Sequence, residues 1–206
     1  MKFHTRLAVT LAIVGATVLA DAGAQSRPAD VLALIQQGVR PSTTRVPATG
    51  EVEFAFSPRQ GAEGLVLRVI TAAKSELRVL GYSFSSAPVT AALIAARKRG
   101  VDVRVVVDHR NNVSEDRSGK ARAALGALAL AGVQVRTIGA YAIHHDKVIV
   151  ADRSTTRTGS FNYSAAAANA NSENVLVLWN NPAVAQGYLR HWERNWRQGA
   201  DWKPAF

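Results

Sequence analysis

Apolar residues recur along the chain at two spacings, which predict alternating strands and helices from residue 51 onwards. Alternating or nearly continuous apolar positions predict strands at 52–56, 77–84, 101–107, 133–137, 147–151 and 174–179, and residues 157–161 are predicted to form a further strand. Apolar positions three or four residues apart predict helices at 61–74, 89–98, 121–131, 164–169 and 182–198. We therefore expect a single layered α-β-α domain of the α/β class, with a mixed, mostly parallel central sheet.

The first residues of the chain do not follow this pattern. Residues 1–24 open with the positive charges of Lys2 and Arg6, continue with an uncharged apolar run at 7–20, and reach small residues around Ala24. This order is typical of a cleaved bacterial signal peptide, so we expect a periplasmic or secreted protein. An uncleaved N-terminal anchor is the alternative. No other segment is apolar enough to span a bilayer, so we expect no stable membrane insertion after cleavage.

The remainder of the chain divides into an arm and a domain. Residues 25–50 are predicted to be an N-terminal arm and linker, because they combine one short helical pattern with prolines, serines and threonines. Residues 51–206 are predicted to form the folded domain. The chain of 206 residues is 48% hydrophobic, which is enough for a domain with its own core.

Charge and cysteine content restrict the possible functions. Lys and Arg number 25 against 15 Asp and Glu, which gives a formal net charge of +10. This excess suggests an anionic partner such as nucleic acid or an acidic membrane surface. The alternative is a generally basic protein, since net charge does not say where the charges cluster. The absence of cysteine excludes disulfides, thiolate metal sites and cysteine nucleophiles.

Candidate chemistry concentrates in the window 145–162. Two predicted strands there flank a segment rich in turn-forming residues, so we expect a hairpin. Side chains two apart on a strand share a face, so His145 and Lys147 should point the same way, as should Ser160 and Asn162. This arrangement can surround one anionic centre with a nucleophile, a cation and hydrogen-bond donors.

The neighbouring residue, His144, should point to the opposite face of the strand and is expected not to be catalytic. The run of two histidines and an aspartate at 144–146 suggests a metal site only superficially. No second ligand cluster occurs at a fitting spacing, so we expect no metal.

The pattern His-x-Lys-x4-Asp-x6-Gly-Ser-x-Asn occurs once, as His145, Lys147, Asp152, Gly159, Ser160 and Asn162. It resembles the HKD motif of the phospholipase D superfamily. Blocks at 82–84, 98–103, 171–174 and 179–196 resemble the small bacterial endonuclease branch of that superfamily. The resemblance covers about residues 51–202. It implies a phosphodiesterase that needs neither a metal nor a cofactor and that cleaves DNA with little sequence preference; whether RNA is also cleaved stays open.

The resemblance also implies a two-step mechanism. One histidine attacks phosphorus to form a covalent phosphohistidine, and a second histidine protonates the leaving oxygen and then activates water. His145 is the expected nucleophile. Because the motif occurs once, the second histidine should come from another copy of the chain, which predicts a homodimer with a shared active site.

The other motif residues receive supporting roles. Lys147 and Asn162 are expected to bind the non-bridging phosphate oxygens, and Ser160 to support the site through hydrogen bonds. Glu173 is the expected partner of the His145 ring nitrogen that does not attack. Asp152 belongs to the motif, but we expect it to hold the hairpin or to pair with a basic neighbour, because a carboxylate repels phosphate.

Two other functions stay open. The same chemistry could act on a phospholipid or another phosphodiester, although no amphipathic membrane-binding helix is evident in the sequence. A non-enzymatic module that binds nucleic acid or lipid through its charge is the second alternative. Binding alone does not require His145 and Glu173 together, so the intact motif argues against it.

Overall fold

The computed structural model describes residues 43–204, and the chain from Thr44 onwards forms one compact unit. The expected signal peptide and most of the expected arm lie outside the described residues. Within 43–204, none of the helices combines the length and the apolar character needed to cross a membrane.

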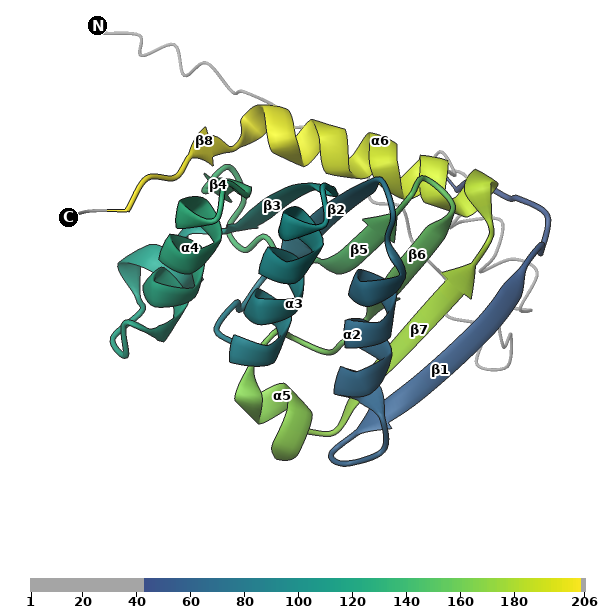
Figure 1. The fold of residues 1–206 in the computed structure, drawn as a ribbon, viewed down its shortest axis with the longest axis horizontal. Helices are drawn as coiled ribbons and strands as arrows, with labels where there is room; N and C mark the ends of the chain where they lie inside the picture. Colours follow the sequence, from purple (N-terminus) through teal and green to yellow (C-terminus); the bar gives the residue numbers. More distant parts are fainter. Residues whose placement is uncertain (1–42, 205–206) are drawn as a thin grey trace, which may run out of the picture. The chain divides into compact units, whose positions relative to one another are not determined.

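The middle layer is one eight-stranded sheet (Figure 1). Its strands are β1 (Glu51–Ser57), β2 (Glu76–Gly81), β3 (Asp102–Asp108), β4 (Gln134–Ile138), β5 (Lys147–Ala151), β6 (Thr155–Gly159), β7 (Glu173–Trp179) and β8 (Ala200–Asp201). The helices are α2 (Ala62–Ala72), α3 (Ala87–Lys98), the π-helical turn η1 (Arg110–Ser114), α4 (Lys120–Leu130), α5 (Ala165–Asn169) and α6 (Pro182–Gln198). The predicted pattern of elements is largely reproduced; η1 interrupts an expected loop, and β8 was not predicted.

The strands lie in the order β1-β7-β6-β5-β2-β3-β4-β8. The layered α/β arrangement and the mixed sheet are confirmed, but the sheet is not mostly parallel. Only β2–β3 and β3–β4 pair in parallel, whereas the other five pairs are antiparallel. Parallel neighbours need long crossover connections. Strands β5, β6 and β7 are instead joined by a tight turn and by a segment that contains only the five-residue α5.

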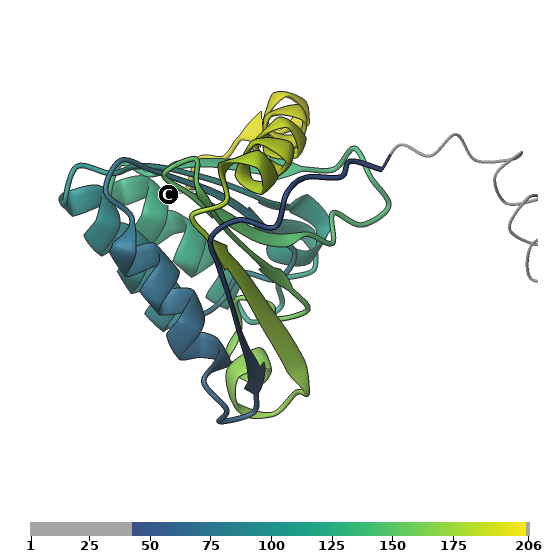
Figure 2. The ribbon, with the colours of Figure 1, turned by 90° about the vertical axis from the view of Figure 1, so that its right-hand side faces the viewer.

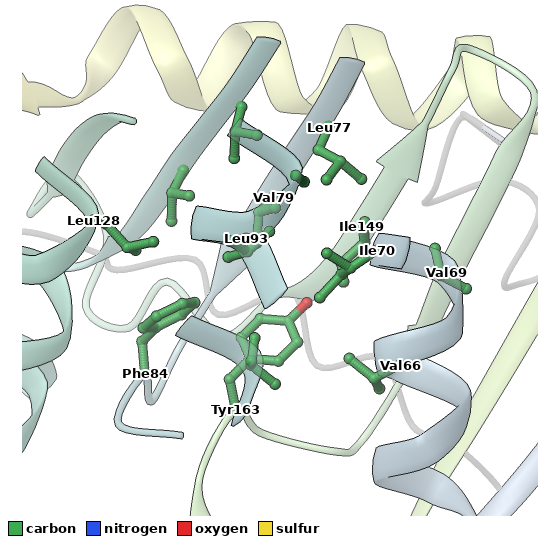
Figure 3. Packing of buried hydrophobic residues seen from close by; sticks show 14 of the residues in the cluster. Val66, Val69, Ile70, Leu77, Val79, Phe84, Leu93, Leu128, Ile149 and Tyr163 are labelled. Carbon is green, nitrogen blue, oxygen red and sulfur yellow. The ribbon is translucent and has the colours of Figure 1, made fainter. Parts of the chain in front are cut away.

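Helices cover both faces of the sheet. Helices α2, α3, α4 and α5 pack on one face, and α6 packs alone on the other (Figures 1 and 2). Alternation along β5 explains the two cores: Ile149 joins Ile70 and Leu93 beneath the four helices (Figure 3), while Val148 and Val150 lie beneath α6. The sheet is therefore buried on both sides at its centre.

The face of β1 that points away from the four helices is apolar and exposed. Val52, Phe54 and Phe56 are 59%, 64% and 45% exposed, and the rings of the two phenylalanines contact each other at a centroid distance of 5.8 Å. Their neighbour Ala55 packs against the core on the opposite side. This apolar strip on an edge strand is an unusual surface for a monomer.

One edge of the sheet collects the ends of strands that carry the motif. Strands β2 and β6 end there at Gly81 and Gly159, while β5 and β7 begin there at Lys147 and Glu173. The antiparallel register places Gly81 opposite Lys147. Residues from four separate parts of the sequence therefore meet at this edge.

Candidate active site

His145 and Lys147 lie together at the start of β5. The Lys147 side chain is buried, at 5% exposure, and its Nζ donates a hydrogen bond to the His145 carbonyl oxygen at 2.7 Å. The His145 side chain is exposed. None of the hydrogen bonds found within residues 43–204 involves its ring, so the ring is accessible to a substrate.

Tyr82 contacts both of these side chains. Its ring centroid lies 4.7 Å from that of His145, and Lys147 Nζ lies 5.1 Å from the same tyrosine centroid. The Lys147 cation thus packs over the Tyr82 ring, and the His145 imidazole contacts the same ring at an interplanar angle of 53°. The sequence pattern did not single out Tyr82 as a functional residue. The available signal was its place directly after a buried strand, where functional loops often begin.

The electrostatics of Lys147 reflect its burial. Burial lowers the pKa of Lys147 to about 8, and the positive charge of Arg157 acts in the same direction, while the carboxylates of Glu173 and Asp146 act against it. The ammonium therefore predominates at neutral pH but titrates within the range of ordinary assays. A buried cation at a sheet edge is well suited to bind an anionic group.

The Gly159–Ser160 pair at the end of β6 lies against Asn174 of β7. Gly159 has φ +137°, and a Cβ atom there would lie 2.3 Å from the Asn174 carbonyl oxygen, so only glycine fits. The Ser160 hydroxyl accepts hydrogen bonds from the Asn174 backbone N–H at 3.0 Å and from its Nδ2 at 3.2 Å. The structure therefore places Ser160 as a support between two strands.

Asn162 follows in a half-buried position. Its Oδ1 atom is buried and finds no hydrogen-bond partner within the described part of the chain. The next residue, Tyr163, donates its backbone N–H to the Ser83 carbonyl at 3.1 Å, which holds this segment beside the loop that carries Tyr82. Asn162 is thus held at the same edge as Lys147, and its Nδ2, which makes no hydrogen bond within residues 43–204, is the group that could donate to an anion.

Glu173 lies at this edge but not in the expected contact. It is half-buried at the start of β7, and its Oε1 accepts a hydrogen bond from Asn171 Nδ2 at 3.0 Å. Within residues 43–204 no hydrogen bond joins it to the His145 ring. Its charge instead acts on Lys147, whose pKa it raises against the effect of burial.

The structure does not bring Asp152 to this edge. Asp152 follows the last residue of β5, so roughly 17 Å of strand separates it from Lys147. Its carboxylate accepts hydrogen bonds from the backbone N–H groups of Lys74, Ser75 and Glu76 at 2.9, 2.8 and 3.0 Å. Asp152 therefore fastens the β5–β6 turn to the α2–β2 connection, as a structural residue does.

We expect Asp152→Asn to lower the free energy of unfolding by about 2–3 kcal/mol at pH 7, because charge-assisted hydrogen bonds are lost. Burial raises the pKa of the Asp152 carboxyl, but the hydrogen bonds from Ser75, Glu76 and Lys74 together hold it below its usual value. The stabilisation is therefore complete above about pH 4 and is lost as the pH falls through the lowered pKa.

Urea unfolding at pH 7 and near pH 3 measures this effect. Glu193→Gln, which removes an exposed carboxylate on α6, serves as the control and should change the free energy of unfolding little. An Asp152→Asn protein as stable as the wild type at pH 7 would contradict the structural role.

The residues on either side of His145 are anchored on the α6 side of the sheet. His144 is buried and donates its backbone N–H to Asp108 Oδ2 at 2.9 Å. Burial lowers the pKa of the His144 imidazole. Asp146 Oδ2 lies 2.8 Å from His191 Nε2 on α6. His144 thus faces away from the exposed ring of His145, as the sequence predicted.

The basic residues at the end of α3 are not part of this edge. Helix α3 ends where β3 begins, whereas the site lies where β3 ends. The Arg99 guanidinium contacts the carbonyl oxygens of Ile70, Thr71 and Ala73. Arg97 donates to the Gly132 carbonyl. These arginines stabilise loops at the end of the sheet opposite the site, where β3 begins.

The described residues also limit what the site can hold. Across residues 43–204, no three His, Asp or Glu side chains are grouped so that they would hold a metal ion. A buried ammonium, an accessible imidazole and an amide are the groups that meet at the sheet edge. Together they can bind an anion and deliver a nucleophile to it.

Comparisons with known proteins agree on one family. A family model described as "Cardiolipin synthase, PLD-like domain" matches residues 66–196. A protein named phospholipase D from Rickettsia felis is 35% identical over 142 residues, covering 69% of this chain and 68% of that protein. A mitochondrial cardiolipin hydrolase from Mus musculus is 32% identical over 133 residues, covering 65% and 57%.

Solved structures give the same result. The crystal structure of Nuc from Salmonella typhimurium, a phospholipase D family member, matches with a TM-score of 0.71 and 42% identity, covering 74% of this chain and 98% of that one. NucT from Helicobacter pylori matches with a TM-score of 0.61 and covers 74% and 100%. At 18% identity, the NucT match supports the fold alone.

Proposed function

The chain belongs to the phospholipase D superfamily and is a phosphodiesterase, and we propose that it is an endonuclease that cleaves DNA with little sequence preference. The observation that carries this proposal is the pairing of an exposed imidazole, His145, with a buried ammonium, Lys147, at one sheet edge. A formal net charge of +10 favours a polyanionic substrate that is bound through its phosphates.

In the proposed reaction, a neutral His145 ring nitrogen attacks phosphorus and the bond to the leaving oxygen breaks. The leaving oxygen takes a proton from a second, protonated histidine. That histidine then removes a proton from water, the water oxygen attacks phosphorus, and the bond to His145 breaks, which regenerates both rings. Lys147 and Asn162 stabilise the charge on the non-bridging oxygens, and Ser160 holds the strand ends in place.

The second histidine is proposed to come from another copy of the chain. Each of the other histidines within residues 43–204 is held elsewhere: His109 by Thr137 Oγ1 at 3.1 Å, His144 by burial, and His191 by Asp146. A two-fold dimer that places two His145 rings across one phosphate would supply both the nucleophile and the acid. We also propose export to the periplasm or the medium, on the basis of residues 1–24.

We expect the purified protein to degrade plasmid DNA at the same rate in the presence of excess EDTA, because His145 needs no metal to attack phosphorus. Gel electrophoresis of supercoiled plasmid measures this rate, and the same protein is assayed on phosphatidylcholine and cardiolipin vesicles. Activity that is abolished by EDTA and restored by a divalent cation would contradict the mechanism. Headgroup release that is faster than DNA cleavage would contradict the proposed substrate.

A phospholipid is the second candidate substrate. It is favoured by the names of two relatives, a phospholipase D and a cardiolipin hydrolase. The exposed strip of Val52, Phe54 and Phe56 on β1 would also suit contact with a lipid surface. The vesicle assay separates this candidate from DNA cleavage.

A further inference from the structure

Arg157 on β6 is an arginine without an acidic partner in the centre of the protein. Its side chain is fully buried, at 0% exposure. Within residues 43–204 no Asp or Glu lies at ion-pair distance from its guanidinium, whereas Arg78, the other buried arginine, pairs with Glu76 and Asp102. Burying a cation without an ion-pair partner is unfavourable, although the charge of Glu173 acts on it from a longer distance.

The Arg157 guanidinium joins the two segments that carry the candidate site. Its Nη1 donates to the Lys147 carbonyl oxygen at 2.9 Å, and its Nη2 donates to the Phe161 carbonyl oxygen at 3.0 Å. Lys147 is the first residue of β5, and Phe161 lies between Ser160 and Asn162. One planar group therefore spans the ammonium-bearing strand and the turn that bears the carboxamide.

Aromatic rings enclose the same guanidinium. The Arg157 Cζ lies 5.6 Å from the ring centroid of Phe161 and 5.4 Å from that of Tyr163, and Nη1 lies 3.4 Å from the Tyr163 hydroxyl oxygen. Burial raises the pKa of Tyr163 to about 12, so this hydroxyl stays neutral and cannot compensate the charge. The positive charge of Arg157 is thus fixed in a water-free environment directly behind Lys147.

Resting on the proposed phosphodiesterase function, we propose that Arg157 is a positioning residue of this site. Its guanidinium sets the distance between Lys147 and Asn162 and provides a fixed positive charge behind the bound phosphate. A charge held in a low-dielectric interior acts over a longer distance than one in water, and it needs no reorganisation when the substrate arrives. An effect of the substituted charge on the kinetics would distinguish this role from a purely structural one.

Two substitutions separate the charge from the hydrogen bonds. Arg157→Met removes both in a side chain of similar length, and Arg157→Lys retains a charge but cannot bridge two carbonyl oxygens. The matched control is Arg78→Met, which removes a buried arginine where β2 begins, at the edge opposite the site. Each protein is assayed with bis(p-nitrophenyl) phosphate over a range of pH, and its thermal unfolding is recorded.

For Arg157→Met we expect kcat/KM to fall at least about tenfold at temperatures where thermal unfolding shows the protein to be folded. We also expect the alkaline limb of its pH profile to move to higher pH, because the positive charge of Arg157, which lowers the pKa of Lys147, is gone. Arg157→Lys should lose at least about tenfold in kcat/KM while its alkaline limb stays near that of the wild type. Arg78→Met should leave both kinetic quantities unchanged.

A folded Arg157→Met protein with wild-type kcat/KM and an unmoved alkaline limb would overturn the proposal. If that variant does not fold, Arg157→Lys decides: wild-type kcat/KM overturns the proposal, and the expected loss supports it. An inactive wild-type protein would instead contradict the proposed function itself, so the two failures are distinguishable.

Discussion

Replacing His145 with alanine should reduce phosphodiester hydrolysis by about 10⁴-fold or more, because His145 is the proposed nucleophile that forms the covalent intermediate. The His145 ring is exposed and outside the network of hydrogen bonds described within residues 43–204, so its loss should leave the fold and its thermal stability intact. His109→Ala, which removes a ring held by Thr137, is the control and should retain activity within a few-fold.

The same variant tests the shared site. If two His145 rings act on one phosphate, a dimer with one wild-type chain is inactive. Equal amounts of the two chains, unfolded and refolded together, should then retain about a quarter of the activity of the same total amount of wild-type protein. Independent sites predict about one half. Retention of one half by a protein that is dimeric in sedimentation would refute the two-histidine mechanism, and trapping a phosphorylated His145 would support it.

Replacing Lys147 with methionine should lower kcat/KM by about 10²- to 10³-fold, which is the loss typical when one charge-stabilising donor is removed. The wild-type profile should fall above about pH 8, because burial lowers the pKa of Lys147 to about 8 and only the protonated ammonium binds phosphate. The sign follows from the charge: deprotonation on the alkaline side removes the cation, and the acid side is unaffected by this group.

Lys147→Arg provides the matched comparison. Arginine stays charged throughout the range, so residual activity in this variant should show no decline near pH 8. Rates measured between pH 6 and pH 10 with bis(p-nitrophenyl) phosphate test this expectation. If Lys147→Met and Lys147→Arg both keep the alkaline decline of the wild type, another group titrates there.

Most elements of the fold were predictable because they have a clear apolar period of their own. The hairpin of β5 and β6 was predicted from the turn residues between them, but β6 carries no apolar period and spans Thr155–Gly159 instead of the predicted 157–161; its register pairs Ile149 with Arg157. The parallel content of the sheet was not predictable in the same way. It depends on which strands become neighbours, and β2 pairs with β5 across a long stretch of sequence.

The motif residues were predictable because they are local in sequence, whereas Glu173, predicted from outside the window, lies at the edge without the expected contact to His145. His145, Lys147, Ser160 and Asn162 lie within one window, and the structure brings them to one edge. Asp152 lies in the same window but at the other end of β5. The extended strand carries it away from Lys147, although the two residues are close in sequence.

Two residues of the site were not predicted from the sequence, because their contacts depend on the tertiary structure. Tyr82 reaches the site because Gly81 pairs with Lys147 across the sheet. Arg157 looked like an ordinary charged residue on a strand, since arginine is rarely buried. Its role depends on carbonyl groups and rings that only the folded chain assembles around it.

The pairing of β1 with β7 has a consequence for how the protein folds. Glu51 pairs with Trp179, so the first strand of the sheet finds its partner only after nearly the whole domain is available. Contacts between such distant parts of a chain slow folding, because a large loop must close before they form. Until β7 arrives, the apolar residues of β1 have no strand beside them. A chain that stops before residue 173 should therefore aggregate, and the edge that carries the candidate site should form only in the last stage of folding.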